Sequence, residues 1–139
     1  MDTSKLDMEE ITAALEDHSG MAIYYLDREI GNVMPLAEYD HIDGDEALRE
    51  QIDENPSRYI MIDPIPSRDS FRFMEEFVES LPDGEDKRIL ERALEWRKPF
   101  SNFKNALYDM PEIRERWFVF KNECMRRYIL EWIKDIGEE

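Results

Sequence analysis

The sequence lacks most features that mark secreted, membrane or phosphate-binding proteins. Its single cysteine, Cys124, cannot form an internal disulfide, so we expect a reducing compartment. The longest apolar run, residues 21–26, is far shorter than the roughly 20 residues that cross a bilayer. The first residues show no basic stretch followed by an apolar one, so we expect no signal peptide. None of the five glycines belongs to a phosphate-binding loop. These absences predict a soluble, cytoplasmic protein with no membrane partner.

The sequence does contain enough apolar material for a core. Hydrophobic residues make up 42% of the 139 positions, although 37% are charged. A chain of this length is typical of one ordinary domain. Because no linker or internal repeat is evident, we expect a single compact α+β domain over residues 1–139. In it an acidic, β-containing half, residues 1–66, precedes an aromatic, helical half, residues 67–139.

The net charge of −16 is unevenly distributed along the chain. Residues 1–70 contain 18 acidic and 5 basic side chains, whereas residues 71–139 contain 16 and 13. The second part also holds 12 of the 16 aromatic residues, including all three tryptophans. This asymmetry predicts two surfaces of different electrostatic character. The overall charge disfavours duplex DNA as a partner, because it repels phosphates.

The pattern of the acidic half predicts a small three-stranded sheet with two helices. We expect strands over residues 21–27, 32–36 and 58–63, and helices over residues 4–17 and 44–54. Ser4 is the expected N-cap of the first helix. Pro35 has no N–H to donate to a sheet, so the second strand is expected to be short or to lie at an edge.

The aromatic half is expected to be all-helical and to pack on the sheet, which makes the fold class α+β. Four helices are expected: Ser67 caps the first, Asp83 can cap the second, the third begins at Pro99 and the fourth begins near Pro111. In the second of these helices, the expected apolar residues include Leu90 and Trp96. The last helix is expected to end at Gly137, a natural C-terminal cap.

No catalytic motif is complete in the sequence. An EF-hand loop with its glycine at Gly44 would have its first and third ligands at positions 39 and 41. Carboxylate or amide side chains are expected there, but the sequence has Tyr39 and His41. Ser101 and Lys104 match a Ser-x-x-Lys pattern, but the companion motifs of the enzymes that use it are absent. We therefore expect no catalytic residue, metal or cofactor. The alternative of a metal-dependent enzyme that uses the acids near residues 40–46 stays open.

The candidate binding residues belong to two groups of opposite charge. The basic group interleaves with aromatic residues over residues 97–127 and comprises Arg97, Lys98, Lys104, Arg116 and Arg126. The acidic group comprises Asp40, Asp43 and Asp45. Exposed rings beside cations would suit single-stranded nucleic acid. Alternatively, the rings form the core and the cations flank them on the solvent side.

The residues from Tyr59 to Gly137 also resemble a known family. A Phe-x-x-Phe-Lys-x-x-Leu element begins at Phe100, a Trp-x-x-Phe element begins at Trp117, and Glu-Trp-Ile begins at Glu131. This pattern is similar to that of uncharacterised protein family 0158, a set of small bacterial proteins. The resemblance implies a compact, soluble bacterial domain, and it brings no established activity or site residue.

The leading functional hypothesis is a non-enzymatic interaction or regulatory module that binds a protein partner through its acidic surface. Single-stranded nucleic-acid binding through residues 97–127 is the alternative from another class. The sequence leaves the identity of the partner and the oligomeric state open.

Overall fold

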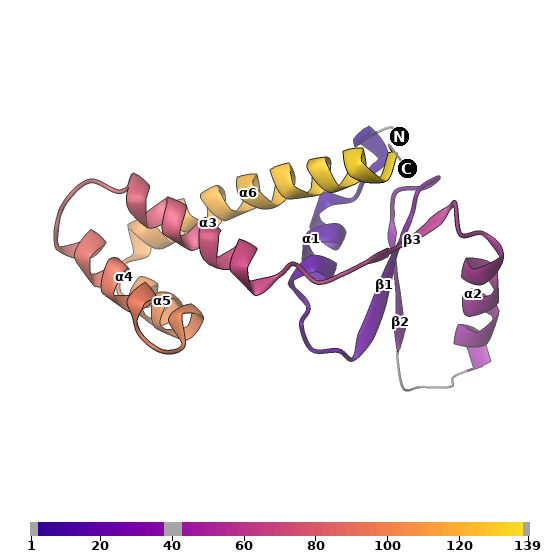
Figure 1. Ribbon diagram of the computed structural model, residues 1–139, viewed down its shortest axis with the longest axis horizontal. Coiled ribbons are helices and arrows are strands. Elements are labelled where there is room, and N and C mark those ends of the chain that lie inside the picture. The colour runs from indigo at the N-terminus through magenta and orange to yellow at the C-terminus, as the bar shows by residue number, and fades with distance from the viewer. Residues whose placement is uncertain (1–2, 38–42, 138–139) are drawn as a thin grey trace. The chain divides into compact units, whose positions relative to one another are not determined.

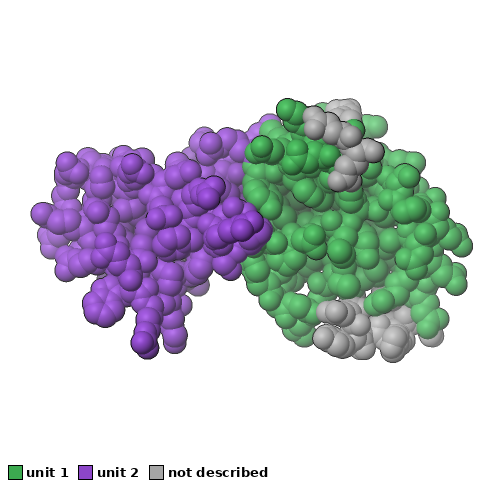
Figure 2. All heavy atoms as spheres, in the orientation of Figure 1, with its two compact units in different colours: residues 1–65, 128–139 green, residues 66–127 purple. Residues whose placement is uncertain are grey.

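The computed structural model describes residues 3–37 and 43–137 and divides the chain into two compact units. Unit 1 comprises residues 1–65 and 128–139, and unit 2 comprises residues 66–127 (Figures 1 and 2). The first boundary lies close to the expected change from the acidic to the aromatic half, but the end of the chain belongs to unit 1. That the two units act as a single domain stays a prediction.

Unit 1 is built on a three-stranded antiparallel sheet, which confirms the expected α+β class. Its strands are β1 (Ala22–Asp27), β2 (Val33–Ala37) and β3 (Tyr59–Ile62), in the order β2-β1-β3. In the pairing of β1 with β2, Pro35 lies opposite Tyr24. The expectation that β2 is a short edge strand is therefore confirmed.

Two helices of unit 1 contact the sheet, α1 (Met8–Glu16) and α2 (Asp43–Glu54). Alternate residues of a strand face opposite sides of a sheet. Leu26 and Ile62 are buried on one side, and α1 contacts β2 and β3 and buries Ile11, Ala14 and Leu15. The other side carries a separate cluster in which residues of α2 pack on the strands. That cluster comprises Leu36, Ile52 and Tyr59 with Tyr25, Met34 and Leu48.

A buried carboxylate organises the turn between β1 and β2. Asp27 is only 2% exposed, and its two oxygens accept hydrogen bonds from the Arg58 guanidinium at 3.0 and 2.9 Å. It also accepts backbone N–H groups from Glu29 at 3.0 Å and Ile30 at 3.3 Å. The side-chain hydrogen bonds from Arg58 lower the pKa of Asp27, with the backbone donors adding to the effect.

Gly31 ends the same turn in a conformation that only glycine adopts easily. Its φ is +91°, and a Cβ atom there would lie 2.1 Å from the carbonyl oxygen of Lys5. The approach is close because the carbonyl of Gly31 accepts the N–H of Asp7 at 3.0 Å. The β1–β2 turn thereby holds the residues that lead into α1.

Three helix caps differ from the sequence-based expectation, and the first is that of α3 (Ser67–Ser80), whose N-cap is Pro66 rather than Ser67. Ser4 lies in a short 3-10 helix, η1 (Thr3–Lys5), and the N-cap of α1 is Asp7, whose side chain accepts the N–H of Glu10 at 3.1 Å. Serine and aspartate are both good caps. Asp7 is held at the start of α1 because its backbone N–H donates to the carbonyl of Gly31. The N-cap of α4 (Glu85–Glu95) is Gly84 rather than Asp83. Asp83 instead pairs with Lys87 at 3.6 Å.

Unit 2 is all-helical and has its own aromatic core. It contains α3 (Ser67–Ser80), α4, α5 (Pro99–Tyr108) and the first part of α6 (Pro111–Gly137). The Trp117 ring lies 5.0 Å from the Phe103 ring and 5.4 Å from the Phe77 ring, measured between centroids. Such tilted and edge-on pairs suit the charge distribution of aromatic rings. The helical content of this half was expected from the sequence.

Helix α6 runs through both units of the chain. It supplies Trp117, Cys124 and Met125 to the buried residues of unit 2, and it supplies Ile129, Ile133 and Ile136 to those of unit 1. It ends at Gly137, as expected from the sequence. No helix among the described residues is long and apolar enough to span a membrane.

Candidate functional site

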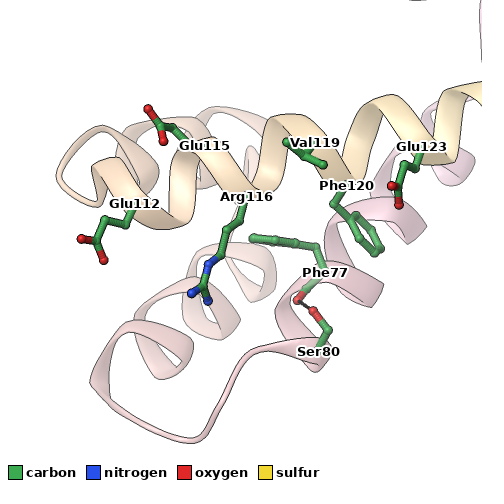
Figure 3. Close-up of a pocket in the computed structure, with 8 residues that line it drawn as sticks. All are labelled: Phe77, Ser80, Glu112, Glu115, Arg116, Val119, Phe120 and Glu123. Carbon is green, nitrogen blue, oxygen red and sulfur yellow. Dashed lines mark hydrogen bonds between the residues drawn. The ribbon is translucent and has the colours of Figure 1, made fainter.

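Unit 2 carries an open groove between α3 and α6. We call it the α3–α6 groove, and it has a volume of about 630 Å³. It is lined by Phe77, Ser80, Glu112, Glu115, Arg116, Val119, Phe120 and Glu123 (Figure 3). Phe77 reaches it from α3 and Phe120 from α6, with their ring centroids 5.5 Å apart. The groove therefore has an aromatic floor that is part of the core of unit 2.

The lining of the groove combines exposed apolar surface with excess negative charge. Val119 is 62% exposed, so its side chain adds apolar surface to the groove. Three carboxylates, those of Glu112, Glu115 and Glu123, stand apart along α6, with the single guanidinium of Arg116 among them (Figure 3). Arg116 makes no ion pair within the described ranges 3–37 and 43–137. The lining thus keeps a formal net charge of −2.

The Ser80 hydroxyl in the groove is already used within the protein. Its Oγ donates a hydrogen bond of 2.5 Å to the carbonyl oxygen of Phe77, drawn as a dashed line in Figure 3. This contact satisfies the last turn of α3. The other groups that line the groove are the two rings, Val119 and the four charged side chains.

A second acidic surface lies on α2 in unit 1. Glu46, Glu50, Asp53 and Glu54 are all exposed. Their spacing of three and four residues places them on one side of the helix, opposite Leu48 and Ile52 in the cluster on the sheet. Like charges at this spacing repel one another by about 0.2–0.5 kcal/mol per pair. The row therefore opposes helix formation slightly and presents concentrated negative charge to solvent.

The predicted acidic candidates lie at or beyond the start of α2. Asp40 is outside the described residues, and Asp43 and Asp45 are placed in the first turn of α2 by their backbone alone. No group of three or more His, Cys, Asp or Glu that could hold a metal occurs in residues 3–37 and 43–137. The hypothesis of a metal enzyme concerns residues 40–46. Of these, residues 40–42 lie outside the described residues.

The predicted basic candidates are all exposed, but they do not form one surface. Arg97 and Lys98 lie between α4 and α5, and Arg116 lies in the α3–α6 groove. Lys104 is on α5 and Arg126 is on α6. Neither of these last two lines the groove. The sequence placed these cations in one stretch, whereas the helices distribute them.

The aromatic residues of the same stretch divide between core and surface. Phe103 and Trp117 are buried at 2% and 9% exposure, so these two rings are core. Phe100 and Phe118 are exposed at 44% and 47%, and the guanidinium of Arg114 lies 5.6 Å above the Phe118 ring. Neither of the two alternatives drawn from the sequence therefore describes the whole stretch.

The sequence also misplaced Trp96, which was expected on the apolar side of its helix. Helix α4 ends at Glu95, and Trp96 is 68% exposed in an extended conformation beyond the last turn. It lines an open hollow of about 700 Å³ with Arg92, Ala93, Arg97 and Asn102. The one available signal was Pro99, because a proline at the start of α5 requires the preceding helix to stop shortly before it.

Cys124 is buried in this structure. It is 2% exposed, and burial raises the pKa of its thiol, although a contact from Arg127 at 3.4 Å opposes the shift. A thiol with a raised pKa holds little of the reactive thiolate. Cys124 is therefore a poor candidate for a nucleophile.

Together these features define a small α+β protein with one strongly acidic unit and one helical unit that carries an open groove. Comparison with known proteins identifies its family. The model of the uncharacterised protein family UPF0158 matches residues 2–137. The chain belongs to this family, as the motifs in its aromatic half indicated.

The relatives differ in how much of their length the chain covers. A UPF0158 protein of Pseudomonas aeruginosa is 31% identical over 130 residues, which is 94% of this chain and 82% of that protein. UPF0158 proteins of Chlamydia trachomatis and Chlamydia muridarum are 29% and 28% identical over 114 residues. The chain spans only 34% of the length of each chlamydial protein. No solved structure matches the chain.

Proposed function

We propose that this protein is a binding module for a basic, amphipathic segment of another protein. The observation that carries the proposal is the α3–α6 groove, where an aromatic floor and the exposed Val119 meet a rim of three carboxylates. An apolar anchor residue of the partner would cover Val119 and the rings. Lysine or arginine residues one turn away along the partner would meet the carboxylates.

Unit 1 supports the same proposal through its charge. Its sequence contains 21 acidic and 5 basic residues, whereas unit 2 contains 13 of each. The whole net charge of −16 therefore belongs to unit 1. Charge of one sign accelerates the encounter with an oppositely charged partner, while a buried apolar anchor supplies most of the affinity. The acidic surface that the sequence singled out has the first role, and the groove has the second.

A designed peptide tests the groove directly. The probe is a fluorescent amphipathic helical peptide of leucine and lysine, and its binding is followed by fluorescence anisotropy. We expect Val119→Asp to weaken binding at least about tenfold, because it places a charge on the apolar contact, a loss of about 1.4 kcal/mol or more. Phe118→Asp is the matched control, since Phe118 is exposed on the same helix but does not line the groove.

The steering role of unit 1 has a separate readout. Replacing Glu46, Glu50 and Glu54 by glutamine should slow association with the lysine peptide several-fold at about 0.05 M salt and hardly at all at about 0.5 M. The proposal is wrong if the peptide with glutamate in place of lysine binds equally well. It is also wrong if Val119→Asp and Phe118→Asp weaken binding to the same extent.

A further inference from the structure

The end of α4 presents an exposed aromatic ring among cations. Trp96 is 68% exposed, and the other residues that line its hollow are Arg92, Ala93, Arg97 and Asn102. We call this the Trp96 hollow. Most tryptophans of small proteins pack most of their surface against other residues. An exposed tryptophan that lines a hollow with two arginines is typical of a binding surface rather than of a packed core.

The charge at the Trp96 hollow is positive without local compensation. Arg92 and Arg97 line it, and Lys98 follows directly in the chain; all three side chains are exposed. None of the three makes an ion pair with any residue that the structure describes. Glu91 and Glu95 are close in sequence, but neither of them lines the hollow. A ligand there would meet a ring and cations and no carboxylate.

The backbone around Trp96 is held in place by specific contacts. Lys98 has a left-handed backbone conformation, with φ at +59°, and is the one described non-glycine residue that does so. The Asn102 side chain donates a hydrogen bond of 2.8 Å to the Arg97 carbonyl and a longer one of 3.4 Å to that of Ala93. Asn102 thereby ties the first turn of α5 to the end of α4 and holds the backbone that carries Trp96 and Arg97.

We infer that the Trp96 hollow binds single-stranded nucleic acid, with one unpaired base stacked on the indole ring. The guanidinium groups of Arg92 and Arg97, which line the same hollow, pair with the phosphates that flank the stacked base. Stacking of this kind requires an unpaired base, because in a duplex both faces are covered by neighbouring pairs. Unit 2 has no net charge by sequence, so it does not add to the repulsion that the acidic unit exerts on phosphates.

This inference corrects the nucleic-acid alternative that the sequence suggested. That alternative covered residues 97–127, where Phe103 and Trp117 are buried and unable to stack on a base, whereas Phe100 and Phe118 are exposed. The inference takes Trp96, just before this stretch, as the stacking ring and keeps Arg97 and Lys98 as phosphate contacts. The site and its ligand are distinct from the α3–α6 groove and its basic peptide.

A labelled single strand of uridylate, about 15 nucleotides long, is a suitable probe at about 0.05 M salt. We expect saturable binding by fluorescence anisotropy, accompanied by quenching of tryptophan fluorescence. Trp96→Ala should weaken binding about tenfold, and Trp96→Phe should restore most of the affinity while removing most of the quenching. A deoxythymidylate strand of equal length shows whether the site distinguishes RNA from DNA.

Two matched controls separate the hollow from general surface charge. Arg97→Glu should weaken binding more than Arg126→Glu, which makes the same charge change outside the hollow. Tyr108→Ala removes another strongly exposed ring, 76% exposed, and should leave binding unchanged. Val119→Asp should also leave it unchanged, so failure of the peptide proposal and failure of this one are distinguishable.

Several outcomes would overturn the inference. One is the absence of saturable binding to the uridylate strand at low salt, with circular dichroism showing a folded protein. Another is equal affinity of the wild type and Trp96→Ala for the strand. Equal binding of a duplex of the same length, or of a glutamate polymer, would show a general anion surface instead of a base-stacking site.

Discussion

Unit 1 and unit 2 of this protein differ in charge far more than in size. Unit 1 has 77 residues and carries the entire net charge of −16, whereas unit 2 has 62 residues and a formal charge of zero. Within unit 1 the described carboxylates are exposed or half-buried except for Asp27. Unit 2 contains the aromatic core, the α3–α6 groove and the Trp96 hollow.

This difference separates two roles that one surface often combines. Long-range electrostatic attraction depends on net charge and decays with salt, and in the proposed function unit 1 would supply it. Affinity and selectivity depend on local apolar and aromatic contacts, which unit 2 would supply. The total charge of −16 is therefore a poor guide to the surface of unit 2. There the lining of the α3–α6 groove is negative and the lining of the Trp96 hollow is positive.

The largest expected effect comes from removing the central ring of unit 2. Trp117→Ala should destabilise the protein by about 3–5 kcal/mol, because it leaves a cavity among Phe77 and Phe103. Hydrogen exchange should increase in α3, α4 and α5 before it increases in β1–β3, since the sheet has a separate cluster. Trp96→Ala, an exposed tryptophan in the same unit, should change stability by less than about 0.5 kcal/mol. Equal effects of the two variants would contradict the division into core and surface rings.

The next effect concerns the buried ion pair of unit 1. Asp27→Asn removes the charge that the Arg58 guanidinium contacts at 3.0 and 2.9 Å, and should cost about 1–3 kcal/mol. Denaturant unfolding measures this loss. Glu29→Gln is the control, because Glu29 is exposed and lies 3.3 Å from the same guanidinium, so we expect a change of less than about 1 kcal/mol. A loss as large in Glu29→Gln would show that the outer pair matters equally.

Acid should weaken unit 1 through two carboxylates with lowered pKa values. Hydrogen bonds from Ser19 and from the Tyr24 hydroxyl lower the pKa of Asp17 to about 2, and Arg58 lowers that of Asp27. Because the pKa of each carboxyl group is lower in the folded protein, the unfolded chain takes up the proton at a higher pH than the folded protein does. The resulting stabilisation is complete above about pH 4 and is lost as pH falls towards about 2.

Near-ultraviolet circular dichroism of the tyrosines in the sheet follows this loss. Asp17→Asn should reduce the difference in stability between about pH 5 and pH 3, because one of the two groups no longer titrates. Asp63→Asn, which removes an exposed acid of the same unit, should leave the difference as in the wild type. A steeper acid dependence in Asp17→Asn would refute the assignment.

The smallest effect is the response to salt. Carboxylates at positions 46, 50 and 54 of α2 repel one another, so raising salt from about 0.01 to 0.5 M should raise the melting temperature by a few degrees. Replacing the three by glutamine should raise the low-salt melting temperature and reduce its salt dependence. A wild-type melting temperature that falls with salt would show that attractive pairs outweigh repulsion in unit 1.

Much of the fold was predictable because it depends on local patterns. The three strands, the edge position that Pro35 imposes, and the C-terminal end of α6 at Gly137 follow from period and turn chemistry. The start of α1 was missed because two acceptable caps, Ser4 and Asp7, compete nearby. A backbone bond to Gly31, distant in sequence, places the second.

The candidate sites were less predictable because they depend on tertiary placement. The α3–α6 groove brings Phe77 together with Val119, which lie far apart in the sequence. Trp96 fits the apolar period of α4, but the helix stops one residue before it, so the ring lies outside the packed face. Boundaries of this kind change by a residue without altering the hydrophobic pattern.

Pro35 has a consequence for how copies of this protein behave when concentrated. An edge strand exposes N–H and C=O groups to which a strand of another molecule can bind, and this is a common start of aggregation. In β2 the residue in the middle of the strand has no N–H, so an added strand would leave one of its carbonyl groups without a donor. The opposite edge, β3, is only four residues long. The small sheet thus resists extension by a second copy of the chain from both sides.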